Sequence, residues 1–205
     1  MILGLTGSFG SGKSTVAQML TDLAQARVID ADALARDLQL PGRPGHRAIV
    51  EEFGPGILTD SGELNRPELA KRVFGNEAEL QRLNALIHPL VWDEEVRLLE
   101  KYKEEPLVVL MVPLLFETDA HTLCDKVAVV SVDEVSRTDR LARRDGVTPE
   151  QVQRRLAAQM DQAAKEQRAD FVIRNGGSLE ETQAQVRDML ATLGLLDAPG
   201  SREKV

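Results

Sequence analysis

The chain has 205 residues, of which 42% are hydrophobic and 28% are charged, values typical of a globular protein with a full core. Its formal net charge of −8 argues against a nucleic-acid-binding protein that depends on broad attraction to phosphate, and its single cysteine excludes an internal disulfide. No apolar stretch reaches the roughly 18 residues of a membrane-spanning helix. We therefore expect a cytoplasmic protein with no nucleic-acid or membrane partner.

The segment Gly7–Ser14, with the sequence GSFGSGKS, fits the pattern G-x-x-x-x-G-K-[ST] of phosphate-binding loops. Its glycines let the backbone turn tightly, so that successive N–H groups point at a phosphate. Lys13 would bring a charge to the β- and γ-phosphates, and the Ser14 hydroxyl would be a ligand of Mg²⁺. A helix should follow, because its N-terminus adds further N–H groups and a favourable dipole.

The sequence on both sides of the loop supports this interpretation. An apolar run with Ile2, Leu3 and Leu5 predicts a buried parallel strand before it. After it, apolar residues from Val16 to Leu23 recur at helical spacing. The alternative, a glycine- and serine-rich linker that matches by chance, does not explain this order. Because the strand leads directly into the loop, we also expect no signal peptide.

A second strand is predicted over residues 27–29, and two acids, Asp30 and Asp32, follow at its carboxyl end. Ligands of open α/β sheets bind beyond the carboxyl ends of the strands, so these acids should face the phosphates. One of them could orient the hydroxyl that accepts a phosphoryl group. The other interpretation is that one of them caps the next helix, where aspartate is preferred.

Residues 34–106 show helical patterns and no convincing strand. Helices are predicted over residues 46–53, 65–75, 77–87 and, after an interruption at His88-Pro89, 92–102. Such a segment is far longer than an ordinary crossover connection. It favours a platform for a second substrate, which His88 could contact unless that histidine is structural.

Three further strands are predicted over residues 107–112, 127–132 and 171–173. Glu117 follows the first of them and could reach the site, or it could be a loop charge in solvent. Asn175 follows the last and could read the edge of adenine, or it could be a turn residue. No D-x-x-G switch follows these strands, which argues against a GTPase.

Arg137, Arg140 and Arg144 lie at i, i+3 and i+7, so one helix face would carry three guanidinium groups. Arginines on a mobile lid can hold ATP phosphates and neutralise charge during phosphoryl transfer. The other interpretation is a solvated face paired with neighbouring acids.

Two capping boxes predict the starts of helices near the end of the chain. The first, Thr148–Gln151, should begin a helix whose apolar stripe runs through Val152, Leu156, Met160 and Ala163. The second, Ser178–Glu181, should begin the final helix.

Together these residues resemble the dephospho-CoA kinase family, whose members transfer the γ-phosphate of ATP to the ribose 3′-hydroxyl of dephospho-CoA, the last step of coenzyme A biosynthesis. The markers follow in family order across nearly the whole chain. Besides the phosphate loop they are Val28–Asp32 with Ala35-Arg36, Pro41-Gly42, His88-Pro89, Val112–Glu117, Arg140–Gly146, Ala158–Met160 and Ala169–Ile173.

The resemblance implies an α/β fold of the three-layer P-loop NTPase type, with a five-stranded parallel sheet, a helical substrate-binding insertion and a lid. Residues 1–32 and 106–197 would form the nucleotide-binding core. Residues 33–105 would form the helical subdomain for the CoA substrate, and residues 136–150 the lid. We expect a monomer or a weak homo-oligomer.

The resemblance also implies roles for single residues. Asp32 would be the base that activates the 3′-hydroxyl, and Lys13 and Arg140 would be further catalytic residues. ATP with Mg²⁺ would be bound by Phe9, Gly10, Ser11, Gly12, Lys13, Ser14, Thr15, Arg144 and Asn175. The acceptor would be bound by Asp30, Arg36, His88 and Glu117.

Two positions depart from the family pattern, which commonly has glutamine in place of Arg137 and aspartate in place of Arg174. Two other functions stay open at this point. One is a P-loop kinase for another small-molecule or nucleotide hydroxyl. The other is an ATP-dependent switch or binding module without phosphoryl transfer, against which the position of Asp32 argues. If Asp32 were not the base, Glu117 would be the next candidate.

Overall fold

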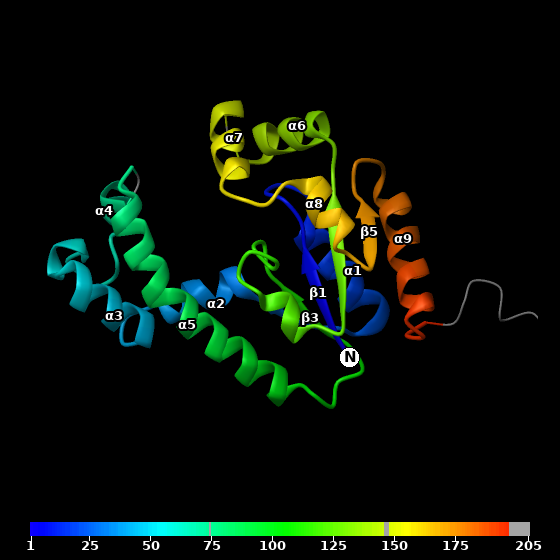
Figure 1. The fold of residues 1–205 in the computed structure, drawn as a ribbon, viewed down its shortest axis with the longest axis horizontal. Helices are drawn as coiled ribbons and strands as arrows, with labels where there is room; N and C mark the ends of the chain where they lie inside the picture. Colours follow the sequence, from blue (N-terminus) through cyan, green and yellow to red (C-terminus); the bar gives the residue numbers. More distant parts are fainter. Residues whose placement is uncertain (74, 146–147, 197–205) are drawn as a thin grey trace, which may run out of the picture. The chain divides into compact units, whose positions relative to one another are not determined.

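The computed structural model describes residues 1–73, 75–145 and 148–196, apart from the side chains of residues 139, 140, 142–145 and 149. Five strands form one parallel sheet with the order β2-β3-β1-β4-β5 (Figure 1). They are β1 (Ile2–Thr6), β2 (Arg27–Asp30), β3 (Val108–Met111), β4 (Lys126–Ser131) and β5 (Phe171–Arg174). All five predicted strands are confirmed, and β1 is the central one.

The strand before the phosphate loop pairs with a parallel neighbour on each side. Leu3 of β1 lies opposite Val109 of β3 and Lys126 of β4. The carboxyl ends of parallel strands meet at one edge of a sheet, where α/β proteins bind ligands. The loop Gly7–Ser14 follows β1 at that edge.

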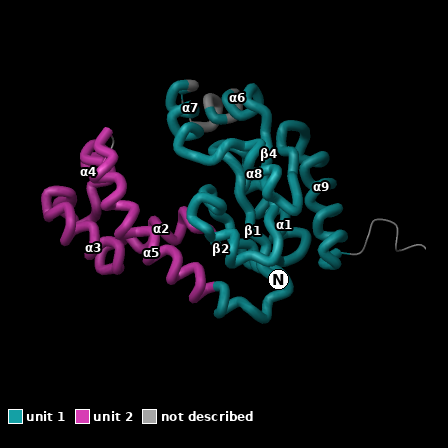
Figure 2. The backbone as a smooth tube through the Cα atoms, in the orientation of Figure 1, with its two compact units in different colours: residues 1–29, 99–205 teal, residues 30–98 magenta. Residues whose placement is uncertain are grey.

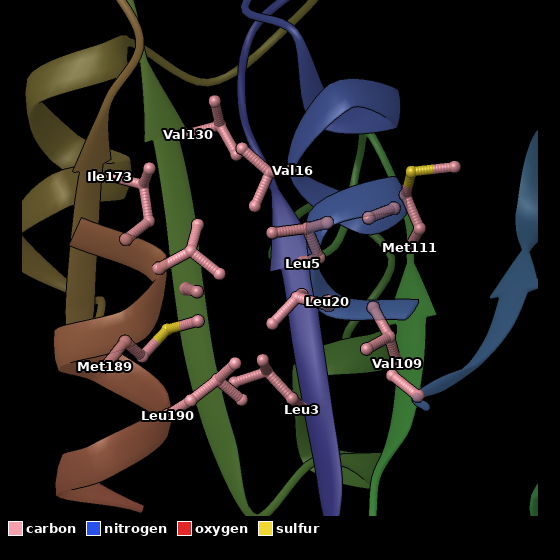
Figure 3. Packing of buried hydrophobic residues seen from close by; sticks show 14 of the residues in the cluster. Leu3, Leu5, Val16, Leu20, Val109, Met111, Val130, Ile173, Met189 and Leu190 are labelled. Atoms are coloured by element: carbon pink, nitrogen blue, oxygen red, sulfur yellow. The ribbon is translucent and has the colours of Figure 1, made fainter. Parts of the chain in front are cut away.

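The part of the chain that forms the sheet also contains α1 (Lys13–Ala24), α6 (Glu134–Asp145), α7 (Pro149–Ala157), α8 (Gln162–Gln167) and α9 (Leu179–Thr192), with the short 3₁₀ helix η2 (Ala120–Leu123). Leu3 and Leu5 of β1 are fully buried and belong to one core with Val16 and Leu20 of α1 and Leu190 of α9 (Figure 3). One face of the sheet is therefore closed by α1 and α9.

The opposite face of β1 is closed by the chain that follows β3. Side chains alternate between the two faces of a strand, and Gly4 stands between Leu3 and Leu5. A Cβ atom at Gly4 would lie 2.8 Å from the Sγ of Cys124 and 3.0 Å from the Cδ2 of Leu115. A larger residue at position 4 would therefore force these side chains to shift. The segment that follows β3 lies on this face of the sheet.

Both predicted capping boxes are present. Thr148 Oγ1 accepts from the N–H of Gln151 at 3.4 Å, and Gln151 Oε1 accepts from the N–H of Thr148 at 3.0 Å. Ser178 and Glu181 form the same pair of bonds at 3.1 and 2.9 Å, and α9 begins there.

The single helix predicted to run through Met160 and Ala163 is wrong, because α7 ends at Ala157 and α8 begins only at Gln162. Asp161 caps α8 by accepting from the N–H groups of Ala163 and Ala164 at 2.9 and 3.3 Å. The N–H of Met160 donates to Glu117 Oε1 at 2.7 Å instead of to a carbonyl of α7. Side-chain acceptors thus replace the helical hydrogen bonds at this break.

The chain forms two compact units, Asp30–Leu98 and the rest of the chain (Figure 2). The first is helical and contains α2 (Ala31–Leu38), α3 (Pro44–Phe53), α4 (Arg66–Val73), most of α5 (Glu77–Lys101) and the 3₁₀ helix η1 (Pro55–Ile57). Its core joins Ile49 and Phe53 of α3 with Leu69 of α4 and Ile87 of α5. The assignment of residues 33–105 to CoA binding and of residues 136–150 to a lid stays a prediction.

The predicted interruption at His88-Pro89 is wrong, because α5 continues from Glu77 to Lys101 with Pro89 inside it. Proline there removes one backbone hydrogen bond and normally kinks or ends a helix. Apolar residues before and after it, Ile87 and Val91, pack against the same helical core. This packing continues across the proline and holds the helix together.

Candidate active site

The phosphate loop has the backbone shape that an anion site requires. Gly7, Gly10 and Gly12 have φ angles of +151°, +78° and +91°, a region that residues with a side chain rarely adopt. Gly12 is the N-cap of α1 and has no side chain with which to cap the helix. A helix N-terminus without a side-chain cap favours a bound anion.

The loop also sits too close to its neighbours for larger residues. A Cβ atom at Gly12 would clash with Nδ2 of Asn175, and one at Gly7 would clash with the carbonyl oxygen of Val130. Both glycines are therefore fixed by packing as well as by their φ angles.

Lys13 lies across the loop. Its Nζ donates to the carbonyl oxygens of Gly7 and Ser8 at 2.8 and 3.3 Å. This places the ammonium group over the same turn that the backbone N–H groups line. The next residue, Ser14, is exposed in the first turn of α1.

The side chain of Asn175 is hydrogen-bonded to the phosphate loop and to α9. Its Nδ2 donates to the carbonyl oxygen of Ser11 at 2.8 Å, and its Oδ1 accepts from Oγ1 of Thr182 at 3.1 Å. Its own N–H donates to the carbonyl oxygen of Ser131 at the end of β4, at 2.7 Å. With 3% of its surface exposed, Asn175 is more than a turn residue, while its predicted contact with adenine stays a prediction.

The two acids after β2 take different positions. Asp30 is the N-cap of α2, and its Oδ1 accepts from the N–H groups of Asp32 and Ala33 at 2.9 and 3.2 Å. Asp32 is exposed in the first turn of that helix. The interpretation that one acid caps the next helix is thus confirmed for Asp30.

The remaining predicted acceptor residues of the helical unit are exposed. Arg36 lies in the last turn of α2, and His88 lies on α5 beside Pro89. Asp30, Asp32, Arg36 and His88 all belong to the unit Asp30–Leu98. That these four side chains meet the phosphate loop stays a prediction.

Glu117 forms an ion pair with a buried lysine rather than facing solvent as a simple loop charge. Lys165 Nζ lies 3.1 Å from Glu117 Oε1 and donates to the carbonyl oxygen of Pro113 at 2.8 Å. Lys165 is fully buried, and the same Glu117 oxygen accepts from the N–H of Met160. The carboxylate thus ties α8 and the α7–α8 connection to the segment that follows β3.

Because of this ion pair, we expect the folded protein to lose stability in acid. Burial alone would raise the pKa of Glu117, but hydrogen bonds from the N–H groups of Met160 and Glu117 and the contact with Lys165 together lower it below its ordinary value of 4.5. A carboxyl group whose pKa is lower in the folded state stabilises the fold above its unfolded-state pKa. It loses that contribution as the pH falls through the folded-state pKa.

We expect Glu117→Gln to lower the free energy of unfolding at neutral pH by about 1.5–3 kcal/mol, the range for a hydrogen bond to a charged group. The difference from the unsubstituted protein should shrink as the pH falls below 4.5. Denaturant unfolding of both proteins over this pH range measures it. The exposed pair of Glu68 with Lys71 offers the control Glu68→Gln, which should change stability little at any pH. A difference for Glu117→Gln that does not depend on pH would contradict the expectation.

Of the three arginines predicted to share one helix face, only Arg137 has a side chain in the described part of the structure, so the shared face stays a prediction. Arg137 is buried, its Nη2 donates to the carbonyl oxygen of Val132 at 3.3 Å, and its side chain packs against Gly10. Burial lowers the pKa of Arg137, although the negative charges of Glu134 and Asp133 act to raise it. Positions 140 and 144 lie on α6, but the side chains of Arg140 and Arg144 are outside the described part, as is residue 146.

Sequence reasoning missed several residues that contact the loop or Glu117. Gln159 and Gln162 bind the start of the phosphate loop, and Lys165 binds Glu117. Gln159 lies in one of the segments that carry the family resemblance, but no role followed from it. From the local sequence, a lysine at position 165 is expected to be exposed to solvent, because nothing nearby indicates that it will be buried.

Within residues 1–73, 75–145 and 148–196, no group of three or more His, Cys, Asp or Glu side chains is arranged to hold a metal ion. Mg²⁺ in phosphoryl-transfer sites takes few protein ligands and is completed by phosphate oxygens and water. The exposed hydroxyl of Ser14 beside the phosphate loop fits such a role. Among the helices of these described residues, none combines the length and the apolar character of a membrane-spanning segment.

The parallel sheet, the glycine-rich loop after its central strand and helix α1 define a P-loop kinase fold. The family model for dephospho-CoA kinase matches residues 1–181. A dephospho-CoA kinase of Symbiobacterium thermophilum is 48% identical over 187 residues, which are 90% of this chain and 78% of that protein. This chain belongs to the dephospho-CoA kinase family, as the sequence motifs indicate.

A second relative and a solved structure also match most of the chain. A dephospho-CoA kinase of Geobacillus kaustophilus is 44% identical over 200 residues, which are 97% of this chain and 98% of that protein. The crystal structure of TT1252 from Thermus thermophilus matches with a TM-score of 0.80 at 35% identity, covering 94% of this chain and 97% of that one.

Proposed function

We propose that this chain transfers the γ-phosphoryl group of ATP to the ribose 3′-hydroxyl of dephospho-CoA, giving CoA and ADP, with Asp32 as the base. Membership of the dephospho-CoA kinase family supports the reaction. One structural observation supports phosphoryl transfer most directly. The loop at the carboxyl end of the central strand has a helix N-terminus and the ammonium group of Lys13 over the same turn.

Phosphoryl transfer requires little covalent chemistry from the protein, so positioning and charge neutralisation dominate. The N–H groups of the loop and Lys13 would bind the β- and γ-phosphates. Mg²⁺, held by Ser14 together with phosphate oxygens, would neutralise charge on the phosphates. Phe9, Gly10, Ser11, Gly12 and Thr15 complete the proposed ATP site.

Asp32 is the better candidate for the base of the two acids after β2. One oxygen of Asp30 already accepts from two backbone N–H groups as a helix cap, which suits a structural or acceptor-binding role. Asp32 is exposed in the first turn of the same helix and follows the carboxyl end of a strand in the same sheet as β1. A carboxylate there could accept the proton of the attacking hydroxyl.

The rest of the proposal concerns parts of the chain that act together with this loop. The side chains proposed to bind dephospho-CoA are Asp30, Arg36, His88 and Glu117. Arg140 and Arg144 would act from a lid, and Asn175 would contact ATP. We further propose a cytoplasmic location, a monomer or weak homo-oligomer, and no nucleic-acid partner.

The test is ADP production from ATP and Mg²⁺ with dephospho-CoA, compared with adenosine, AMP, CMP, shikimate and gluconate as acceptors. Mass spectrometry identifies the product. Turnover with dephospho-CoA alone, giving CoA, is the expected result. Preferred turnover with another acceptor would reject the proposed substrate, and ATP binding without transfer to any acceptor would reject the reaction.

A further inference from the structure

Two glutamine side chains bind the first turn of the phosphate loop. The N–H of Phe9 donates to Gln159 Oε1 at 2.9 Å. The N–H of Ser8 donates to Gln162 Oε1 at 3.4 Å, and the Ser8 hydroxyl donates to the same oxygen. Both glutamines come from the region where α7 ends and α8 begins.

Gln162 is fixed by its other partners. Its Nε2 donates to Glu166 Oε1 at 3.1 Å, and that carboxylate oxygen also accepts from the hydroxyl of Ser131 at 2.6 Å. Because a carboxylate can only accept, Gln162 must turn its NH₂ group to Glu166 and its carbonyl to Ser8. This chain of bonds anchors the start of the loop to α8 and to the end of β4.

Gln159 is placed differently, because it belongs to the connection between α7 and α8. The adjacent Met160 is held by Glu117. Four residues before Gln159, the guanidinium of Arg155 on α7 lies 4.4 Å from the centre of the Phe9 ring. Phe9 is therefore contacted both on its backbone N–H and on its ring by residues of α7 and of the connection after it.

We propose that Gln159 is a positioning residue for the phosphate loop, which acts through Phe9 and together with Arg155. By accepting from the N–H of Phe9, it fixes the direction of the turn Gly7–Gly10 and links this turn to the position of α7. An N–H array that is already oriented needs no reorganisation when phosphate binds. The inference rests on the proposed use of this loop for the phosphates of ATP.

A selective loss of phosphate binding distinguishes this role from a general structural one. We compare Gln159→Leu, which removes the acceptor at similar size, with Gln167→Leu on the exposed end of α8. The affinities for ADP, for a non-hydrolysable ATP analogue and for adenosine are measured by calorimetry or competition, with the melting temperature recorded alongside. These binding measurements need no acceptor, so they are independent of whether dephospho-CoA is the substrate.

For Gln159→Leu we expect binding of ADP and of the ATP analogue to weaken about tenfold, the equivalent of one hydrogen bond. Adenosine affinity should change less than about twofold, and Gln167→Leu should match the unsubstituted protein, as expected for a surface change away from the site. Arg155→Ala should weaken binding of the same phosphate ligands about two- to fivefold, the range for an exposed cation–π contact.

Equal weakening for adenosine and for the phosphate ligands would overturn the proposal, because it would indicate a general structural role. Unchanged binding of the phosphate ligands in Gln159→Leu would overturn it as well. If Gln159→Leu does not fold, Arg155→Ala decides, since its exposed side chain leaves the core intact. A protein that binds these nucleotides as expected but does not phosphorylate dephospho-CoA would contradict the proposed function alone.

Discussion

Asp32→Asn is expected to lower kcat by about 10²–10⁴-fold, the range for loss of a general base. Asparagine has nearly the same size but cannot take up the proton of the attacking hydroxyl. Because Asp32 is proposed to act in chemistry, the affinity for ATP and the KM for dephospho-CoA should change little. Steady-state kinetics with both substrates, together with calorimetric ATP binding, measure the separation of kcat from binding.

A further variant serves as a control for this expectation. Asp60→Asn removes one exposed negative charge from the same helical unit and should leave kcat unchanged. A kcat for Asp32→Asn near that of the unsubstituted protein would show that Asp32 is not the base. Glu117 would then be tested in its place.

The fold could be predicted largely because its signals are local. The strands are short continuous apolar runs, and both late capping boxes are read directly from four residues each. The phosphate loop is also local, since the φ angles of Gly7 and Gly12 follow from the residue type that the motif requires. For these features, propensity and packing agree.

The errors arose where packing or side-chain contacts decided against local propensity. Pro89 would end a helix in isolation, but the apolar residues on both sides of it share one core. The stripe from Val152 to Ala163 has helical spacing, yet the distant Glu117 accepts from the N–H of Met160, and Asp161 caps a new helix. Spacing along the chain contains no information on such partners.

The candidate site shows the same division. Lys13 and Asp32 are recognised from their neighbours in sequence. Gln159 is 150 residues from Phe9, and Asn175 is 164 residues from Ser11, so their contacts with the loop depend on the completed sheet. Residues that form the loop are thus predictable, whereas the contacts that hold it in place are not.

Lys13→Ala is expected to reduce kcat/KM for ATP by at least about 10²–10³-fold, the typical cost of removing one group that stabilises transition-state charge. Its Nζ donates to the carbonyl oxygens of Gly7 and Ser8, so the positive charge already lies over the turn that is proposed to hold the phosphates. ADP affinity should fall as well, because the charge acts on bound phosphate as well as on the transition state.

The fold should survive this change, since Val16 and Leu20 hold α1 to the sheet. Lys71→Ala, at an exposed lysine paired only at the surface with Glu68, controls for the loss of one positive charge and should leave kinetics unchanged. Circular dichroism and the melting temperature establish that Lys13→Ala is folded, and kinetics with ADP titration then measure the effect. If folded Lys13→Ala keeps a turnover within about tenfold of the unsubstituted chain, the loss of rate is smaller than expected for removing such a group. In that case the charge on the phosphates would have to come from other residues, and Arg140 and Arg144 would be the first to test.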